Sequence, residues 1–197
     1  MLIRCLVPAL VCLISGLPAL AAERADPRPE FWSALQALCG QAFAGHLLAY
    51  AEPMDSGWLG EELVMHVREC SDDEIRIPLH VGDNRSRTWV ISRTDDGFRL
   101  KHDHRNEAGD EDGVTWYGGH TTDPGRAFRQ TFPVDDFSRA LFLTNDLAGS
   151  VTNLWTVEVR PGQYFGYELT RLGRNLKVRF DLSEPVDLPP PPWGQDG

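Results

Sequence analysis

The residues best suited to chemistry are two histidines, which stand two positions apart in Lys101-His102-Asp103-His104. In an extended strand, residues at i and i+2 point to the same face, with Cα atoms about 7 Å apart. The alternation that begins at Phe98 predicts that both imidazoles face inward, with Lys101, Asp103 and Arg105 on the exposed face. Two such imidazoles could bind one metal ion.

A metal site here would need a third ligand, and His120 is the nearest candidate along the chain. If the segments 98–104 and 114–120 pair across a loop centred near Gly109, His102 faces Trp116. His120 then lies about 13 Å from that position, which is too far for a shared zinc ion. We therefore interpret His102 and His104 as polar residues that line a pocket, and keep a metal-dependent enzyme using both as the alternative.

Two tryptophans and one amide complete the candidate ligand-binding set of His102, His104, Trp116, Asn153 and Trp155. The tryptophans lie on predicted strands, where they either line a ligand cavity or fill the protein interior. Asn153 interrupts an apolar face, and a buried amide needs a partner such as a ligand or a buried water. The chain carries no nucleophile elbow or phosphate-binding loop, so we expect no cofactor and favour a role without catalysis.

Strands account for most of the elements that must position these residues. Apolar side chains recur at every second position in the segments 62–70, 74–81, 97–105, 151–159 and 176–181. Turn signals about ten residues apart are typical of antiparallel hairpins. We also predict a helix from about Pro27 to Gly40, and a short internal helix capped by Asp135 or Asp136.

The fold class that follows is mainly β. We predict one domain, residues 23–188, that forms an antiparallel calycin-like β-barrel with an N-terminal helix and one short internal helix. A β-sandwich is the alternative. Residues 189–197 begin with four consecutive prolines, which exclude both a helix and a central strand, so they are predicted to form an extended tail.

The N-terminal residues 1–22 read as a signal peptide. Arg4 precedes an apolar run, and Ala19-Leu20-Ala21 offers a small-residue cleavage site. The apolar run is shorter than the roughly 20 residues of a spanning helix, so the mature chain is expected to be exported, periplasmic or secreted, without a membrane span. Cleavage leaves Cys39 and Cys70, which are predicted to form a disulfide in an oxidising compartment.

The charge balance argues against nucleic acid as a partner. The chain has 19 Lys and Arg against 29 Asp and Glu, for a formal net charge of −10. Such a surface repels nucleic acid and anionic lipid. The expected partner is instead a small apolar or amphipathic ligand.

The chain resembles two groups of proteins. A leading helix followed by Gly40-Gln41-Ala42-Phe43-Ala44-Gly45 resembles the start of calycin-type, lipocalin-like barrels, although no Gly-x-Trp stands at this first strand. The segment 76–89, together with 101–104, resembles a group of uncharacterised secreted bacterial proteins. The second resemblance implies export and no activity.

These observations lead to one main hypothesis and two alternatives. The main hypothesis is an exported, non-enzymatic barrel that binds a small ligand. The alternatives are the metal-dependent enzyme using His102 and His104, and a cell-envelope interaction protein that docks a partner through its C-terminal tail.

Overall fold

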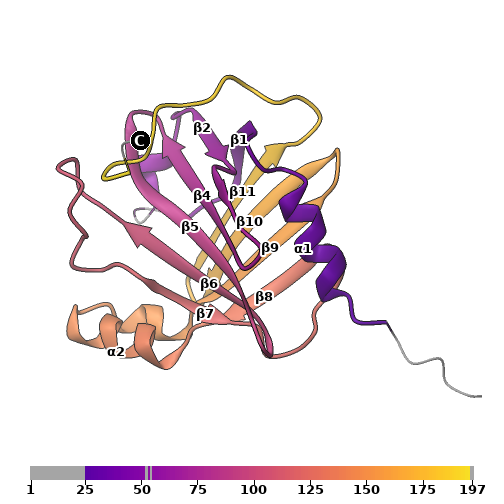
Figure 1. Ribbon diagram of the computed structural model, residues 1–197. Helices are drawn as coiled ribbons and strands as arrows, with labels where there is room; N and C mark the ends of the chain where they lie inside the picture. Colours follow the sequence, from indigo (N-terminus) through magenta and orange to yellow (C-terminus); the bar gives the residue numbers. More distant parts are fainter. Residues whose placement is uncertain (1–24, 52, 54, 196–197) are drawn as a thin grey trace, which may run out of the picture.

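The computed structural model describes residues 25–51, 53 and 55–195, and in this part of the chain the fold is a single antiparallel sheet rolled into a barrel (Figure 1). The strands are β1 (Ala42–Ala49), β2 (Leu63–His66), β3 (Glu69–Cys70), β4 (Glu74–Val81), β5 (Asn84–Thr94), β6 (Gly97–His104), β7 (Tyr117–His120), β8 (Arg129–Pro133), β9 (Leu154–Arg160), β10 (Tyr164–Arg171) and β11 (Arg174–Asp181). Apart from the short β3, which pairs only with β4, neighbouring strands follow chain order around the sheet, and β1 pairs with β11.

The barrel is nearly closed, and its seam lies between β7 and β8. An antiparallel bridge joins Gly119 to Val134, and the Asp135 N–H donates to the Gly118 carbonyl at 3.0 Å. A Cβ at Gly119 would collide with the carbonyl oxygen of Pro133 at the end of β8, so only glycine allows this approach. The predicted antiparallel barrel is confirmed, and the sandwich alternative is wrong.

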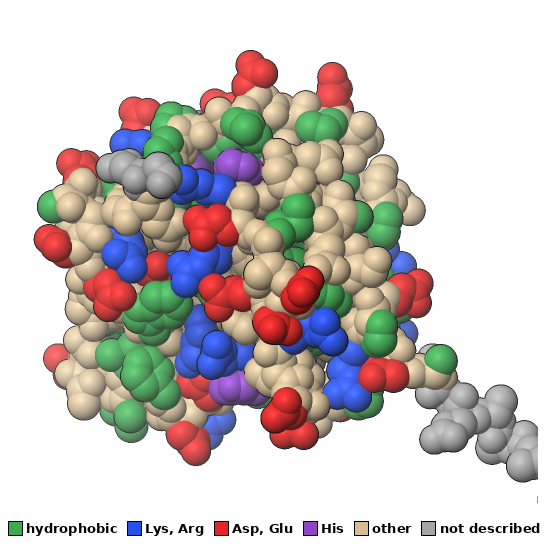
Figure 2. Space-filling view, viewed as in Figure 1, with side chains coloured by type: hydrophobic (Ala, Val, Ile, Leu, Met, Phe, Trp, Pro, Cys, Tyr) green, Lys and Arg blue, Asp and Glu red, His purple; other side chains and the backbone are tan. Residues whose placement is uncertain are grey.

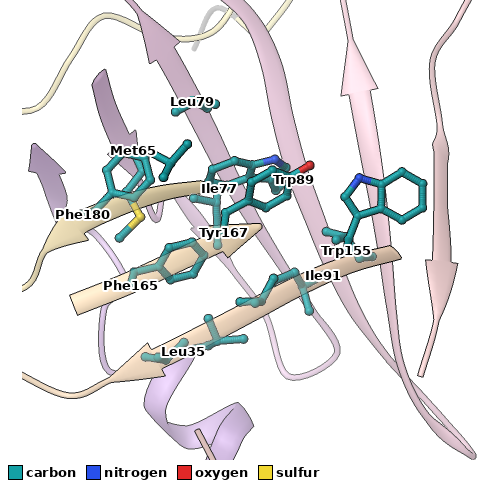
Figure 3. Close-up of a cluster of buried hydrophobic side chains, with 14 of the residues drawn as sticks. Leu35, Met65, Ile77, Leu79, Trp89, Ile91, Trp155, Phe165, Tyr167 and Phe180 are labelled. Atoms are coloured by element: carbon teal, nitrogen blue, oxygen red, sulfur yellow. The ribbon is translucent and has the colours of Figure 1, made fainter. Parts of the chain in front are cut away.

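The interior follows from the alternation of apolar and polar residues along the strands. On β4, Ile75, Ile77 and Leu79 are buried, as are Phe165 and Tyr167 on β10. Figure 3 shows side chains from opposite walls of the barrel meeting in this core. Burial of these faces supplies most of the driving force for closing the sheet.

One end of the barrel is closed by helix α1 (Arg28–Gln36), which buries Phe31, Trp32 and Leu35. The Phe31 and Trp32 rings lie 5.3 and 5.8 Å from the ring of Phe98 at the start of β6. The predicted disulfide is present between Cys39, just after the helix, and Cys70 on β3. The helix is therefore tied to the sheet by apolar packing and by a covalent bond.

The predicted internal helix, α2 (Asp136–Thr144), follows β8. Asp135 is its N-cap, because its carboxylate accepts the Ser138 N–H at 2.9 Å. Two 3₁₀ segments, η1 (Ser56–Trp58) and η2 (Ala148–Thr152), lie in other connections of the barrel. Side chains from α2, η1 and η2 all reach the cavity described below.

The C-terminal segment is extended, as predicted, and packs along the barrel. In Figure 1 it is the yellow chain that crosses above the strands. The Trp193 N–H donates to the Arg85 carbonyl at 3.2 Å, and the Arg85 guanidinium donates to the Pro191 carbonyl at 3.0 Å. Arg68 donates to the Gln195 carbonyl at 2.9 Å.

This packing corrects one expectation for β6. Asp103 points outward as predicted, yet it is only 1% exposed. The Gln195 amide lies 3.5 Å from its carboxylate, and Arg105 and Arg76 form ion pairs with it at 3.2 and 3.7 Å. Alternation predicts the direction of the Asp103 side chain, whereas the packing of the distant C-terminal segment buries it.

The predicted signal peptide, residues 1–22, lies outside the described residues. Among the helices that the structure describes, none is long and apolar enough to cross a membrane.

Candidate ligand-binding cavity

The barrel interior is hollow at the end away from α1, where it encloses a cavity of about 420 Å³. Six ring side chains form much of its wall: Trp89, His102, His104, Tyr117, Trp155 and Tyr167. The rings of Trp89 and Tyr167 stack at 4.3 Å, and Figure 3 shows both beside Trp155. The volume lies in the range of small-molecule sites.

His102 lies deep in this wall and uses both of its ring nitrogens. Nδ1 lies 3.0 Å from the Tyr117 carbonyl, which can only accept, so Nδ1 carries the proton. Nε2 lies 2.8 Å from the Tyr167 hydroxyl and therefore accepts a hydrogen bond from it. Burial, reinforced by the nearby His104, lowers the pKa of His102 to about 3. The imidazole is neutral at physiological pH.

His104 extends the same hydrogen-bonded cluster toward the cavity mouth. Its Nε2 lies 2.9 Å from the Tyr117 hydroxyl. Burial, together with the charge of Arg87, lowers the pKa of His104 to about 4. Burial also raises the pKa of Tyr117 to about 12 and raises that of Tyr167 well above its usual value. The four rings are therefore neutral together.

The third ligand considered for a metal site lies elsewhere. His120 is on the outer surface, half exposed, with Nδ1 3.6 Å from an Asp135 carboxylate oxygen. Among the described residues, no three His, Cys, Asp or Glu side chains gather as a metal site would require. His102 and His104 thus belong to a neutral hydrogen-bonded wall, and His120 is not part of it.

Three arginines also line the cavity: Arg87 on β5, Arg171 at the end of β10 and Arg174 at the start of β11. Arg174 forms an ion pair with Asp55, which is fully buried. Arg171 donates to Ser150 Oγ and to Asn153 Oδ1, each at 3.0 Å.

Arg87 sits between polar and aromatic neighbours at the same end of the barrel. It donates to Asn84 Oδ1 at 3.0 Å and to Ser86 Oγ at 3.3 Å, and its guanidinium carbon lies 5.4 Å from the centre of the Trp58 ring. Burial lowers the pKa of Arg87 and also that of Arg171, where the charge of Arg174 adds to the effect. Positive charge is thus concentrated where water is partly excluded.

The structure brings four of the five predicted ligand-binding residues to this cavity: His102, His104, Asn153 and Trp155. Trp155 is completely buried, and its indole N–H has no hydrogen-bond partner among the described residues. Asn153 is 4% exposed and has Arg171 as its partner. Whether these residues bind a ligand stays a prediction.

The placement of Trp116 was wrong. β6 pairs with β7 so that His102 faces Tyr117, not Trp116. A shift of one residue exchanges the two faces of a strand, so Tyr117 points into the cavity. Trp116 precedes β7 with a φ of +58° and lies on the outer surface, where its indole N–H donates to Glu111 at 2.8 Å.

Sequence reasoning missed the arginines and the two tyrosines of the cavity, although a signal for most of them was present. Arg87 lies two positions before Trp89 on β5, so both side chains point to the same face. Arg171 lies four positions after Tyr167 on β10 and shares its face in the same way. Arg174 lies two positions before Leu176 on β11, whose side chain points inward. Alternation carried to the strand ends would have placed these side chains on the inner face.

Comparison of the chain with protein-family models, with curated proteins and with solved structures found no match. The resemblance to calycin-type barrels therefore stays a prediction.

Proposed function

We propose that the protein is an exported, non-enzymatic binding protein that holds a small amphipathic molecule in its barrel cavity. The observation that carries the proposal is that the barrel interior is apolar and packed at one end and hollow and partly polar at the other. Packed apolar side chains give way to a hollow of about 420 Å³ whose wall combines rings with fixed polar groups. Concave sites of this size with a few convergent polar groups are typical of small-molecule binding.

A binding role fits the wall better than acid–base catalysis. Burial keeps His102 and His104 neutral with pKa values near 3 and 4, far from those useful for proton transfer at neutral pH. Both nitrogens of His102 are occupied by Tyr117 and Tyr167. Such a network supports a rigid wall of defined shape.

Export is supported by the predicted signal peptide and by the Cys39–Cys70 disulfide, since disulfides persist mainly in oxidising compartments. The full chain, expressed in a bacterial host, should appear in the periplasm or medium with a new N-terminus near residue 22. It should contain no alkylatable thiol. A cytosolic product that keeps residues 1–22 and carries all four cysteines as free thiols would contradict this part of the proposal.

Native mass spectrometry of the exported protein, purified without denaturation, tests the binding role. We expect a bound molecule, or a raised melting temperature with members of a small-molecule library. Leu169→Trp should abolish both effects, because Leu169 lines the cavity and a larger ring would fill it.

The matched control is Leu172→Trp, because Leu172 is 98% exposed in the turn that follows β10. This variant should bind as the wild type does. The proposal fails if the wild type carries no ligand and responds to none of the library. It also fails if Leu169→Trp binds as well as Leu172→Trp.

A further inference from the structure

We propose that the ligand is an organic anion whose acidic group binds between Arg87, Arg171 and Arg174 while its apolar part lies against the aromatic wall. This inference rests on the proposed binding function and narrows the class of ligand. Carboxylates, sulfonates and phosphate esters share the required chemistry. Each carries a planar or tetrahedral set of anionic oxygens, and a guanidinium group can donate two parallel hydrogen bonds to such a set.

The first argument is the sign of the charge in the cavity. Three arginines line it, and among the described residues none of those lining it carries a carboxylate. Asp55 balances one cation through its ion pair with Arg174. On the outer face seen in Figure 2, by contrast, acidic and basic side chains are interspersed. In a chain of net charge −10, the described side chains that line the hollow are therefore cationic or neutral.

The second argument is the environment of the individual guanidinium groups. Arg87 donates to the neutral oxygens of Asn84 and Ser86, and no carboxylate of the described residues forms an ion pair with it. A partly desolvated cation beside neutral acceptors is less stable than the same cation beside an anion. Binding an anion would restore this lost stabilisation.

The third argument is geometric. Arg171 and Arg174 are directly paired residues of β10 and β11, so the two cations begin from adjacent backbone positions. Ser150 and Asn153 hold the guanidinium of Arg171, and Asp55 holds that of Arg174. Arg87 lies opposite His104 on the neighbouring β6, in the wall of the same cavity. Side chains held by such contacts form a site that is organised before the ligand arrives.

The aromatic wall supplies the second half of the recognition. Trp89 stacks on Tyr167, and Tyr117 stacks on His102 with ring centres 4.7 Å apart. Flat apolar surface of this kind suits an aromatic or otherwise flat hydrocarbon body. The inferred ligand is therefore an amphipathic anion, and neither a sugar nor an inorganic ion alone.

Two matched probes separate the binding role from the preference for an anion. 1-Anilinonaphthalene-8-sulfonate carries one sulfonate, and N-phenyl-1-naphthylamine has the same ring system without it. We measure the dissociation constant of each by calorimetry and by energy transfer from tryptophan, at 20 and 300 mM NaCl. The sulfonate should bind the wild type at least about tenfold more tightly at low salt, since a hydrogen bond to a charged group is worth about that factor.

The dependence of affinity on salt concentration tests the anion inference in the wild-type protein, without any variant. The sulfonate should lose several-fold in affinity between the two salt concentrations, whereas the uncharged probe should not. Arg87→Gln should weaken sulfonate binding about tenfold and change binding of the uncharged probe less than twofold. Arg171→Gln is a second variant, expected to behave in the same way.

Arg139→Gln is the control, because Arg139 is exposed on α2 and its removal changes the net charge equally. It should leave both affinities unchanged. Equal binding of both probes, or equal weakening of both by Arg87→Gln, would overturn the anion inference and leave the cavity function standing. If neither probe binds in a way that Leu169→Trp prevents, the proposed function itself fails.

Discussion

The two ends of the barrel are built from the same strands and differ in what their inward positions carry. At the α1 end, Phe98 on β6 meets Phe31 and Trp32, and the space is filled by apolar side chains. At the other end, His104 on the same strand faces a cavity with Arg87 beside it. The two β6 positions are roughly 20 Å apart.

Under the proposed function, this difference separates stability from ligand binding within one sheet. Filled apolar space stabilises the fold through transfer and dispersion, and it leaves no room for a ligand. The hollow end gives up that contribution and holds neutral imidazoles and cations at a cost in desolvation. We infer that the α1 end mainly supports the fold and that the cavity end is the part shaped by function.

The largest expected effect compares one phenylalanine from each end. Phe31→Ala should lower the free energy of unfolding by about 3–5 kcal/mol, because Phe31 is fully buried in filled space. Phe142→Ala should cost less, about 1–3 kcal/mol, because Phe142 already borders the cavity. Urea denaturation of both variants measures the difference. Equal losses would show that the two ends are packed alike.

The disulfide gives the next largest effect, and it belongs to the α1 end. Replacing Cys39 and Cys70 together by Ala should lower stability by about 3–4 kcal/mol, since the bond closes a loop with a sequence separation of 31. Under conditions where the variant is folded, its affinity for 1-anilinonaphthalene-8-sulfonate should match that of the wild type. A large loss of affinity would mean that the two ends are not independent.

A pH effect belongs to the cavity end. The pKa of His102 is lowered to about 3 in the folded protein, so the unfolded state, with a pKa near ~6.5, binds protons first. The stabilising contribution is therefore complete above about pH 6.5 and is lost as the pH falls. His102 alone should account for a loss of about 2 kcal/mol between pH 7 and pH 5.

His102→Gln tests this effect, because a glutamine amide can still donate to the Tyr117 carbonyl and accept from the Tyr167 hydroxyl. Urea denaturation at several pH values should show a shallower decline for the variant than for the wild type. Parallel curves for the two proteins would argue against a neutral, buried imidazole at this position.

The smallest effect concerns α2, which borders the cavity. Asp135 caps this helix at Ser138 and also forms an ion pair with Lys101 at 2.6 Å. Asp135→Ala removes both contacts and should cost about 1–2 kcal/mol, whereas Asp135→Asn keeps a capping oxygen and should cost less than about 1 kcal/mol. Thermal melts of the two variants compare them. Equal losses for the two variants would show that the cap contributes little and that the ion pair, which both variants lack, accounts for the effect.

Most of the fold could be predicted from local patterns. Alternation in 74–81, 97–105 and 176–181 placed β4, β6 and β11, and the N-terminal helix was placed from its prolines and the Gly40 end signal. The candidate site was recovered only in part. His102, His104, Asn153 and Trp155 lie at the cavity as predicted, whereas Trp116 and Tyr117 are exchanged. Local alternation does not fix the register between β6 and β7, because a long loop connects them.

The sequence by itself determined the class of fold, the disulfide partners and the inward faces of β4, β6 and β11. A period of two is a local signal, and only one pair of cysteines remains after the predicted cleavage. Tertiary structure alone decided the register of β7, the burial of Asp103 under the C-terminal segment, and which inward positions stay unfilled. Each of these depends on which distant segment lies opposite. Alternation predicts the face to which a side chain points, and only the closed barrel shows which residues surround it.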